Sequence, residues 1–353
     1  MKVWIFVLAC LLHSLSWAQQ ASDRQNYVAY RSDKGLIMDG KLEESDWQLA
    51  NWSVDFVDIE GQHNPAPAYA TRMKMLWDAD YLYLGIWMEE PHLWAKIEED
   101  EQVIYYDPDI EVFIDPDGDT HFYYELEINA LGAVWDLLMS KPYRNGGKAI
   151  NGWDIKGLKK GIHLEGTLND PTDKDAYWSV ELAIPWKALS QQGPNFSTPK
   201  DGEQWRINFS RVHWEVKMVD GDYQKVRDSE TGKPLPEHNW VWSPQGLINM
   251  HVPENWGFVQ FVDAPVGSQT VVFQPHPDEY IKDELRVLYH LQHAYAKEHG
   301  HFAFQLNDLP MPNQPLRIKP EFEVSKTRFK ISAPSNNSGQ IWHITEDSRI
   351  WKQ

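Results

Sequence analysis

Residues 105–135 read YYDPDIEVFIDPDGDTHFYYELEINALGAVW, and this stretch predicts the fold of the chain. Apolar and polar side chains alternate on both sides of a central acidic turn, and period-two alternation over this length indicates two half-buried strands. The turn, residues 115–119, contains aspartates, a proline and a glycine, which are typical turn formers. The segment therefore predicts a β-hairpin with one face in the core and one polar face.

The polar face of this hairpin combines carboxylates and an amide with nearby aromatic rings. Its predicted members are Glu111, Glu125, Glu127 and Asn129, joined from a neighbouring strand by Arg206, Asn208 and Ser210. Sugar hydroxyls require such fixed acceptors and donors, and an aromatic ring can stack on the apolar face of a sugar. The candidate rings are Tyr105, Trp135, Trp94, Trp240 and Trp242. We therefore expect a recessed, solvent-accessible carbohydrate-binding surface.

The composition narrows the classes of partner. A net charge of −19 argues against nucleic acid or an anionic membrane, and it fits a neutral polymer, a small molecule or a divalent cation. The 18 tryptophans outnumber the 15 tyrosines and the 13 phenylalanines. Indole rings can fill a core or stack on sugars, so this excess favours carbohydrate as the ligand. The sequence contains no P-loop or dinucleotide fingerprint, so we expect no nucleotide cofactor.

The first 18 residues predict export. Lys2 precedes a short apolar run, and the segment ends in Ser16-Trp17-Ala18, a pattern typical of a signal peptide cleaved after Ala18. The run is too short to suggest a membrane span. Lipoprotein processing at Cys10, the only cysteine, is the less favoured alternative. We therefore expect a periplasmic or extracellular protein without disulfides.

The remaining chain predicts two units. Residues 19–265 are predicted to form a β-sandwich after a polar lead-in at 19–35, with a strand pair at 71–77 and 81–88. Residues 275–353 are predicted to form a small α+β appendage, because helical spacing runs from 280 to Gly300 and short β-like runs follow at 316–318, 322–324, 328–331 and 340–344. Long loops at 139–154, 191–201 and 220–237 either build the binding site or have no role in binding.

Seven motifs in order resemble those of the family 9 carbohydrate-binding modules and cover residues 36–262. They are DG-x-LxExxW (39–47), MLWDADYLYLGIWMEE (75–90), DPDIEVFIDPDGD (107–119), YYELEINALG (123–132), WSVELAIPWKAL (178–189), WRINFSRVHW (205–214) and NWGFVQF (255–261). The resemblance implies an antiparallel β-sandwich with immunoglobulin-like or jelly-roll-like layers, and the alternating strands support it. It also implies a non-catalytic sugar-binding protein of polysaccharide catabolism that acts beside a separate glycoside hydrolase.

The resemblance also implies roles for particular residues. Tyr105 takes the place of one sugar-stacking aromatic, and Glu111 and Glu127 take the places of charged sugar-contacting residues. A second aromatic normally precedes the closing strand, but residues 249–253 contain none. Related modules often hold structural calcium, which favours a calcium site.

The acidic turn is the candidate calcium site. Calcium binds clusters of oxygen ligands and tolerates irregular geometry, so we expect Asp115, Asp117 and Asp119 as ligands. The alternative is a plain hairpin turn, since the spacing does not match an EF-hand.

Three other functions are open at this point. Glu125 and Glu127 lie two residues apart on one strand and could serve as paired carboxylates of a glycoside hydrolase. Met250 and His251 form the only pair suited to haem, and no haem-attachment motif is present. The sandwich could also be a docking surface for another protein.

Overall fold

The computed structural model describes residues 24–192, 198–311 and 315–353. The predicted signal peptide, with Cys10 and the cleavage point at Ala18, lies outside the described residues. No helix of the described part is long and apolar enough to cross a membrane.

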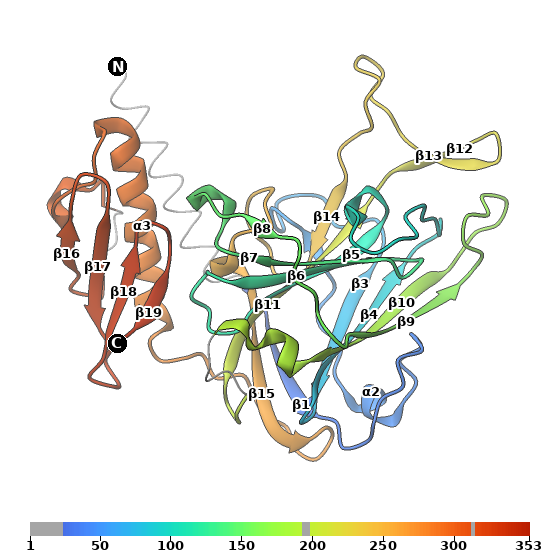
Figure 1. Cartoon of the computed structure of the whole chain (residues 1–353), viewed down its shortest axis with the longest axis horizontal. Coiled ribbons are helices and arrows are strands. Elements are labelled where there is room, and N and C mark those ends of the chain that lie inside the picture. Colours follow the sequence, from blue (N-terminus) through green and yellow to red (C-terminus); the bar gives the residue numbers. More distant parts are fainter. Residues whose placement is uncertain (1–23, 193–197, 312–314) are drawn as a thin grey trace.

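Two β-layers form the main body of the protein (Figure 1). One has the strand order β8-β7-β6-β5-β11, with β14 and β2 attached to β11, and the other has the order β1-β3-β4-β10-β9. Strand β15 pairs with both β11 and β1, so the hydrogen bonding continues from one layer to the other. The strand bounds are β1 Asn26–Arg31, β2 Val57–Asp58, β3 Thr71–Trp77, β4 Tyr81–Glu89, β5 Asp109–Asp115, β6 Tyr123–Asn129, β7 Val134–Met139, β8 Ala149–Ile150, β9 Lys159–Glu165, β10 Tyr177–Pro185, β11 Gln204–His213, β14 His238–Val241 and β15 Gly257–Pro265.

Short elements connect these strands. They are the helix α2 (Ser45–Leu49), the hairpin of β12 (Val216–Val219) and β13 (Asp222–Lys225), and the 3-10 turns η1 (Ile104–Tyr106), η2 (Tyr143–Asn145), η3 (Trp186–Gln192) and η4 (Pro253–Asn255). The hairpin β12–β13 projects from the sandwich on the side away from the C-terminal unit (Figure 1).

The predicted hairpin of residues 105–135 is confirmed. Strands β5 and β6 pair antiparallel, and their alternating apolar residues, such as Val112 and Leu126, enter the core between the two layers. The opposite face places Glu111 directly across from Glu127. The sandwich prediction therefore holds, and the hairpin positions the polar face as expected.

The expected loose lead-in at residues 19–35 is wrong for residues 26–31. These residues form β1, which lies inside the sheet, parallel to both β15 and β3. Tyr27 and Ala29 point into the core, and Trp77 donates a hydrogen bond from its indole nitrogen to the Ala29 carbonyl at 3.1 Å. The run is polar enough to resemble a loop, but two buried side chains at period-two spacing are sufficient to place it in the sheet. The sandwich is therefore mixed rather than purely antiparallel.

The C-terminal unit has its own apolar core between one helix and one sheet. The sheet order is β16-β17-β18-β19, and the helix ends at Gly300 in the left-handed conformation (φ +76°), as the stop signal predicts. Residues 316–318 form no strand, and the last strand, β19, was not expected. The bounds are α3 Glu279–His299, the turn η5 Leu306–Asp308, β16 Glu321–Val324, β17 Phe329–Pro334, β18 Ile341–Thr345 and β19 Ile350–Lys352.

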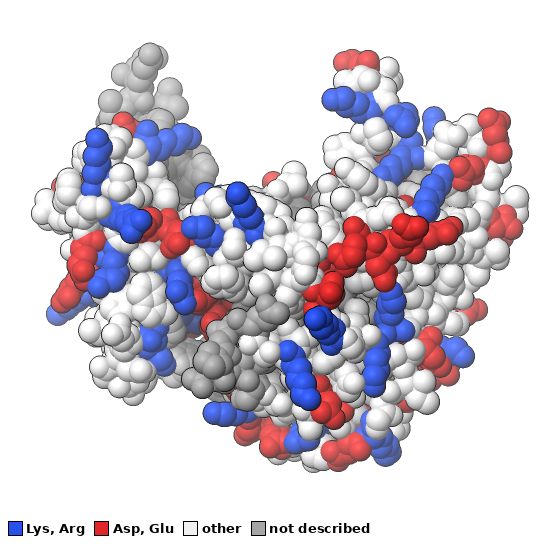
Figure 2. All heavy atoms as spheres, viewed as in Figure 1, with Lys and Arg blue, Asp and Glu red and all other residues white. Residues whose placement is uncertain are grey.

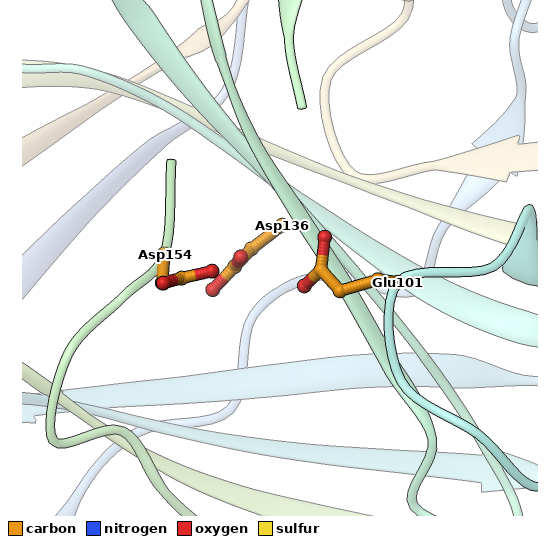
Figure 3. Close-up of side chains that lie close together, drawn as sticks. All are labelled: Glu101, Asp136 and Asp154. Atoms are coloured by element: carbon orange, nitrogen blue, oxygen red, sulfur yellow. The ribbon is translucent and has the colours of Figure 1, made fainter. Parts of the chain in front are cut away.

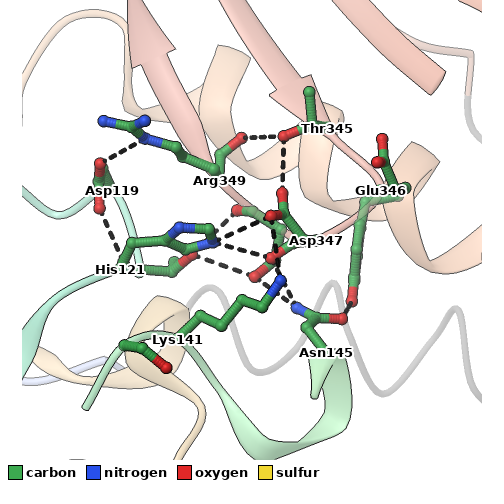
Figure 4. A network of polar contacts seen from close by, with 12 residues as sticks. Asp119, His121, Lys141, Asn145, Thr345, Glu346, Asp347 and Arg349 are labelled. Carbon is green, nitrogen blue, oxygen red and sulfur yellow. Dashed lines mark hydrogen bonds and ion pairs between the residues drawn. The ribbon is translucent and has the colours of Figure 1, made fainter. Parts of the chain in front are cut away.

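Polar contacts hold the C-terminal unit against the sandwich (Figure 4). Arg349 donates from Nε to Asp119 Oδ2 at 2.9 Å, and Asn145 donates from Nδ2 to the Asp347 carbonyl at 2.7 Å. Tyr289 on α3 donates its hydroxyl proton to Asn145 Oδ1 at 2.7 Å. The unit therefore docks on the acidic turn and on the loop after β7.

Candidate functional site

Four carboxylates line the polar face of β5 and β6. The relative exposures of Asp109, Glu111, Glu125 and Glu127 are 0%, 7%, 6% and 2%. An apolar cluster beside them joins Phe113 and Tyr123 of this face to Ile59, Met250 and Trp256 from distant segments. The expectation of a recessed, solvent-accessible face is therefore corrected in its second part, because the four carboxylates are largely enclosed.

Burial and mutual repulsion control the charge of these groups. Burial raises the pKa of Glu111 to about 7. The pKa values of Asp109, Glu125 and Glu127 are raised well above the ordinary range, mainly by burial and secondly by repulsion from the charge of Glu111. Among the described residues, the basic group near Glu125 is His251, whose Nε2 lies 4.0 Å from Oε2. Burial lowers the pKa of His251 to about 4, so this ring is neutral at pH 7 and leaves the acidic cluster uncompensated.

Aromatic rings border the carboxylates. Tyr105 precedes β5, and its backbone N–H donates to Glu127 Oε2 at 3.0 Å. Trp135, half-buried on β7, lies directly across from Glu127. The backbone of Tyr105 and the strand position of Trp135 therefore lie beside Glu127, and the stacking of either ring on a sugar remains a prediction.

Tyr143 is the residue that sequence reasoning missed. It lies in η2, half of its surface is exposed, and its ring centroid is 4.4 Å from that of His251. Burial and the charges of Glu125 and Glu127 raise its pKa. Its contact with His251, whose Nε2 lies 4.0 Å from Glu125 Oε2, places it beside the same face. It supplies a second exposed ring from the loop at 139–154, whereas the sequence directed attention to residues 249–253. The only available signal was the glycine- and proline-rich character of that loop.

The surface is hollowed in this region. Figure 2 shows a depression between the C-terminal unit and the projecting loop that joins β13 to β14, over the part of the sandwich that holds β7 and β8 in Figure 1. A groove of about 250 Å³ lies beside Tyr106, whose ring centroid is 4.9 Å from that of Tyr105. Its walls include Trp94, Tyr223 and Lys225. None of Glu111, Glu125 and Tyr143 lines this groove, so it is separate from the recessed face.

Four predicted contact residues have structural roles instead. Asn129 donates to the Ile97 carbonyl, Asn208 donates to the Ser243 carbonyl, and Arg206 pairs with Glu279 of the C-terminal unit. Trp242 is enclosed in the main core. All four are at least 97% buried, so the expectation that they contact a ligand is corrected for Asn129, Arg206, Asn208 and Trp242.

The predicted calcium ligands converge, but their oxygens have other partners. Oxygens of Asp115, Asp117 and Asp119 lie within 4.8 Å of one another. Asp115 accepts the N–H groups of Gly118 and Thr120, and Asp119 accepts the guanidinium of Arg349. A cation at this turn would compete with that guanidinium, so the geometry fits calcium poorly. The site remains a prediction.

A third carboxylate group joins Glu101, Asp136 and Asp154 from three segments (Figure 3). Glu101 and Asp154 are exposed, and Asp136 is buried and accepts the Ile155 N–H at 2.7 Å. Water can screen the two exposed charges. An acidic band also crosses the sandwich in Figure 2, so carboxylates are frequent on this surface.

The free energy of unfolding is expected to fall as the pH rises from about 5 to about 8 in protein stripped of divalent cations. A carboxyl whose pKa is raised by folding binds more protons in the folded state than in the unfolded state. Its contribution to the free energy of unfolding is therefore complete below its unfolded pKa of about 4 and is lost as the pH rises through its folded pKa. For Glu111 that folded pKa is about 7. Urea unfolding across this range measures the slope, and Glu111→Gln should flatten it. A slope that Glu111→Gln leaves unchanged would contradict the assignment.

Comparison with known proteins gives the following relatives. A protein from Bacteroides uniformis, provisionally assigned as carbohydrate-binding, is 18% identical with a TM-score of 0.49, and 67% of this chain and 99% of that chain are covered. A family 9 module from Caldicellulosiruptor kristjanssonii in complex with cellotriose is 12% identical (TM-score 0.44; 70% and 99% covered). The structure of such a module with glucose is 14% identical (TM-score 0.42; 69% and 98% covered). The curated proteins contain no significant match.

The family comparison covers more than half of the chain. The model of the family described as carbohydrate family 9 binding domain-like matches residues 37–229. This span includes the hairpin, the four buried carboxylates and Tyr143, and it ends before the closing strand β15. The chain therefore belongs to the carbohydrate family 9 binding domain-like family.

Proposed function

We propose that the protein binds an oligosaccharide or polysaccharide at the recessed face of β5, β6 and β7. One observation carries this proposal: Glu125 Oε2 is buried without a hydrogen-bond partner among the described residues, and His251, 4.0 Å from that oxygen, contacts the exposed ring of Tyr143. A buried acceptor without a donor is costly, and a sugar hydroxyl can supply the missing proton. Tyr143, with Tyr105 and Trp135, offers ring faces for the apolar side of the sugar.

The geometry favours binding over hydrolysis. A glycoside hydrolase needs one protonated carboxyl and one ionised carboxylate on either side of the scissile bond. Here burial raises the pKa values of both Glu125 and Glu127, so nothing separates them into an acid and a nucleophile. Glu127 is also 98% buried and accepts the Tyr105 N–H. We therefore infer that the sugar is bound without being cleaved.

We place the protein outside the cytoplasm, acting in polysaccharide catabolism beside a separate glycoside hydrolase. The N-terminal export pattern and the family membership support this role. The sugar itself is to be found by a glycan array, and cellotriose and glucose, bound by the module from C. kristjanssonii, belong on that array. Cell fractionation tests the location.

Tyr143→Ala and Glu125→Gln are each expected to weaken binding of the array-identified sugar by about 10- to 100-fold, because one removes a stacking ring and the other a charged or strongly polar acceptor. Isothermal titration calorimetry on the full chain measures the affinities. Phe304→Ala is the matched control for Tyr143, since Phe304 is an equally exposed aromatic on the C-terminal unit. Glu323→Gln, at an exposed position, is the control for the charge change.

Two results would count against this function. Unchanged affinity in both Tyr143→Ala and Glu125→Gln would move the sugar site elsewhere. A blank glycan array together with stoichiometric capture of one protein partner would favour a protein-docking surface instead.

A further inference from the structure

A cavity of about 550 Å³ lies where the C-terminal unit meets the sandwich. One part of its wall comes from the turn after β5 and from the start of β11, another from α3, β18 and β19, and the connecting segment 274–277 completes it. Ligand sites of this size occur preferentially between domains. Glu125 and Tyr143 do not line the cavity, so it is distinct from the recessed face of β5, β6 and β7.

Buried cations outnumber buried carboxylates beside this cavity. Arg206 and Lys282, which line it, both pair with Glu279. Arg24 and Arg286 lie 3.5 and 3.9 Å from the same carboxylate. Of these four cations, Arg24 alone has a second carboxylate within ion-pair distance among the described residues. Uncompensated buried charge is costly, so a further anion at this place would be stabilising.

Arg286 shows the deficit most directly. Its relative exposure is 6%, and its Nε and Nη1 atoms have no hydrogen-bond partner in the part of the chain that the structure describes. Its Nη2 atom donates to the carbonyl of Gly118, which lines the cavity, at 3.4 Å. Burial lowers the pKa of Arg206 to about 9, and the charges of Arg24 and Arg286 lower it further against the attraction of Glu279. The positive charge at the junction is therefore only partly compensated.

Three nitrogen-bearing groups surround the ring of Trp342 in the wall of the cavity. The ammonium nitrogens of Lys282 and Lys352 each lie 5.4 Å from the centre of this ring, and the His276 ring lies 6.5 Å from it. Lys352 makes no ion pair with any described residue. His276 accepts the Asp278 N–H at Nδ1, and burial lowers its pKa, so its Nε2 carries the proton and can donate. These groups can therefore bind an anion held beside Trp342.

The wall that the sandwich contributes offers acceptors instead. The amide nitrogen of Gln204 donates to the Gln274 carbonyl at 2.6 Å, whereas its Oε1 is buried without a hydrogen-bond partner among the described residues. Asp117, on the turn after β5, adds an exposed carboxylate to this wall. Hydroxyl groups are the natural donors to such acceptors. The cavity therefore suits a molecule that carries an anionic group on one side and hydroxyl groups on the other.

We propose that this cavity is a second ligand site and that it binds a hexuronate, the carboxylate form of a six-carbon sugar. The carboxylate would contact Lys282, Lys352 and His276, and a hydroxyl would donate to Gln204. Sulfate has no hydroxyl to donate and glucose has no charge, so neither matches both walls. Residues 275–353 carry no net charge, so the net charge of −19 belongs to the rest of the chain and the anion enters beside the neutral unit. The proposal is independent of the sugar bound at the recessed face.

Isothermal titration calorimetry of the full chain with D-glucuronate and D-galacturonate tests the site. Glucose and sulfate are the comparison ligands, because each has only one of the two required features. At least one hexuronate should bind about tenfold more tightly than sulfate, and glucose should not displace it. The bound hexuronate should also raise the unfolding temperature, because it contacts both units in the folded state only.

Lys352→Gln is expected to weaken hexuronate binding about tenfold, because it removes one ammonium group from the carboxylate. Lys352 is exposed and takes no part in the ion pairs of Glu279, so this variant should fold as the wild type does. Lys326→Gln, at an exposed position of the same unit, is the matched control and should leave the affinity unchanged. Gln204→Leu should weaken hexuronate binding but not sulfate binding, which separates recognition of the hydroxyl from a general loss of structure.

Four results would overturn the proposal. The first is a wild type that binds neither hexuronate, and the second is equal hexuronate affinity in Lys352→Gln and Lys326→Gln. The third is equal affinity for sulfate and both hexuronates, which would reduce the cavity to an unselective anion site. The fourth is hexuronate binding that Tyr143→Ala abolishes and Lys352→Gln preserves, which would place the ligand on the recessed face. None of the four refutes the proposed function, which Tyr143→Ala and Glu125→Gln test with the array-identified sugar.

Discussion

Replacing Glu279 with glutamine is expected to lower the free energy of unfolding by about 3–5 kcal/mol, because it leaves several buried cations without their anion. Glu279 begins helix α3 and is buried where the C-terminal unit meets the sandwich. It contacts Arg206 and Lys282, and Arg24 and Arg286 lie 3.5 and 3.9 Å from the same carboxylate. Desolvation opposes its charge, but these cations together hold the pKa of Glu279 well below its usual range.

Urea unfolding at neutral pH measures this effect, and Glu323→Gln is the matched control. Glu323 lies in the same unit and pairs with Lys330 at 2.7 Å, but its side chain is largely exposed. A solvent-exposed pair contributes about 0–1 kcal/mol, so the control should unfold nearly as the wild type does. Equal stability of the two variants would show that the cations at this junction are compensated without Glu279.

The same variant is expected to weaken sugar binding, although Glu279 is remote from the proposed sugar contacts. The turn η2 carries Tyr143, and the two residues that follow it are tied to the C-terminal unit. Asn145 bonds to Tyr289 and Asp347, and Arg144 pairs with Glu254 at 2.8 Å, while His290 of α3 lies 3.6 Å from that same carboxylate. Loosening the unit should therefore release Tyr143 from its position.

The sequence predicts the hairpin well but not what covers it. Alternation assigns Glu111 and Glu127 to one face because the side-chain period of a strand is fixed. It cannot show that Met250 and Trp256, more than 120 residues later, pack beside that face and enclose it. The predicted contacts of Arg206 fail for a similar reason, since its partner Glu279 belongs to the other unit.

Tyr143 illustrates a different limit. It occupies an irregular loop without periodicity, and its place is set by contacts of its neighbours with residues near positions 290 and 347. Sequence reasoning found the loop by its glycines and proline, but it had no means to select one ring in it. Residues held by strands were therefore predictable, and residues held by docking between units were not.

Trp47→Ala is expected to lower the free energy of unfolding by about 3–5 kcal/mol, as for a large side chain removed from a core. Trp47 is fully buried in a cluster with Leu42 and with Tyr83 and Ala183 of the sheet, and its indole N–H donates to Glu181 Oε1 at 2.6 Å. The other oxygen of Glu181 accepts the Gly40 N–H at 2.7 Å. Gly85 lies across from Glu181 on β4, and a Cβ there would approach Leu42 to 2.3 Å, so the site is tightly packed.

Trp47→Phe separates packing from hydrogen bonding, because it keeps a ring and leaves Glu181 without its indole donor, at an expected cost of about 1–3 kcal/mol. Urea unfolding measures both variants, and Trp351→Ala, at a half-buried position, should cost less than Trp47→Ala. Sugar affinity of folded Trp47→Phe should equal that of the wild type. A selective loss of sugar binding with unchanged stability would contradict this.

Trp47, Gly85 and Glu181 come from three separate motifs of the family pattern, and they meet on the far side of the core from Glu125 and Tyr143. Much of that pattern therefore encodes the packing of the sandwich, and of the two proposed sugar contacts it contains Glu125 but not Tyr143.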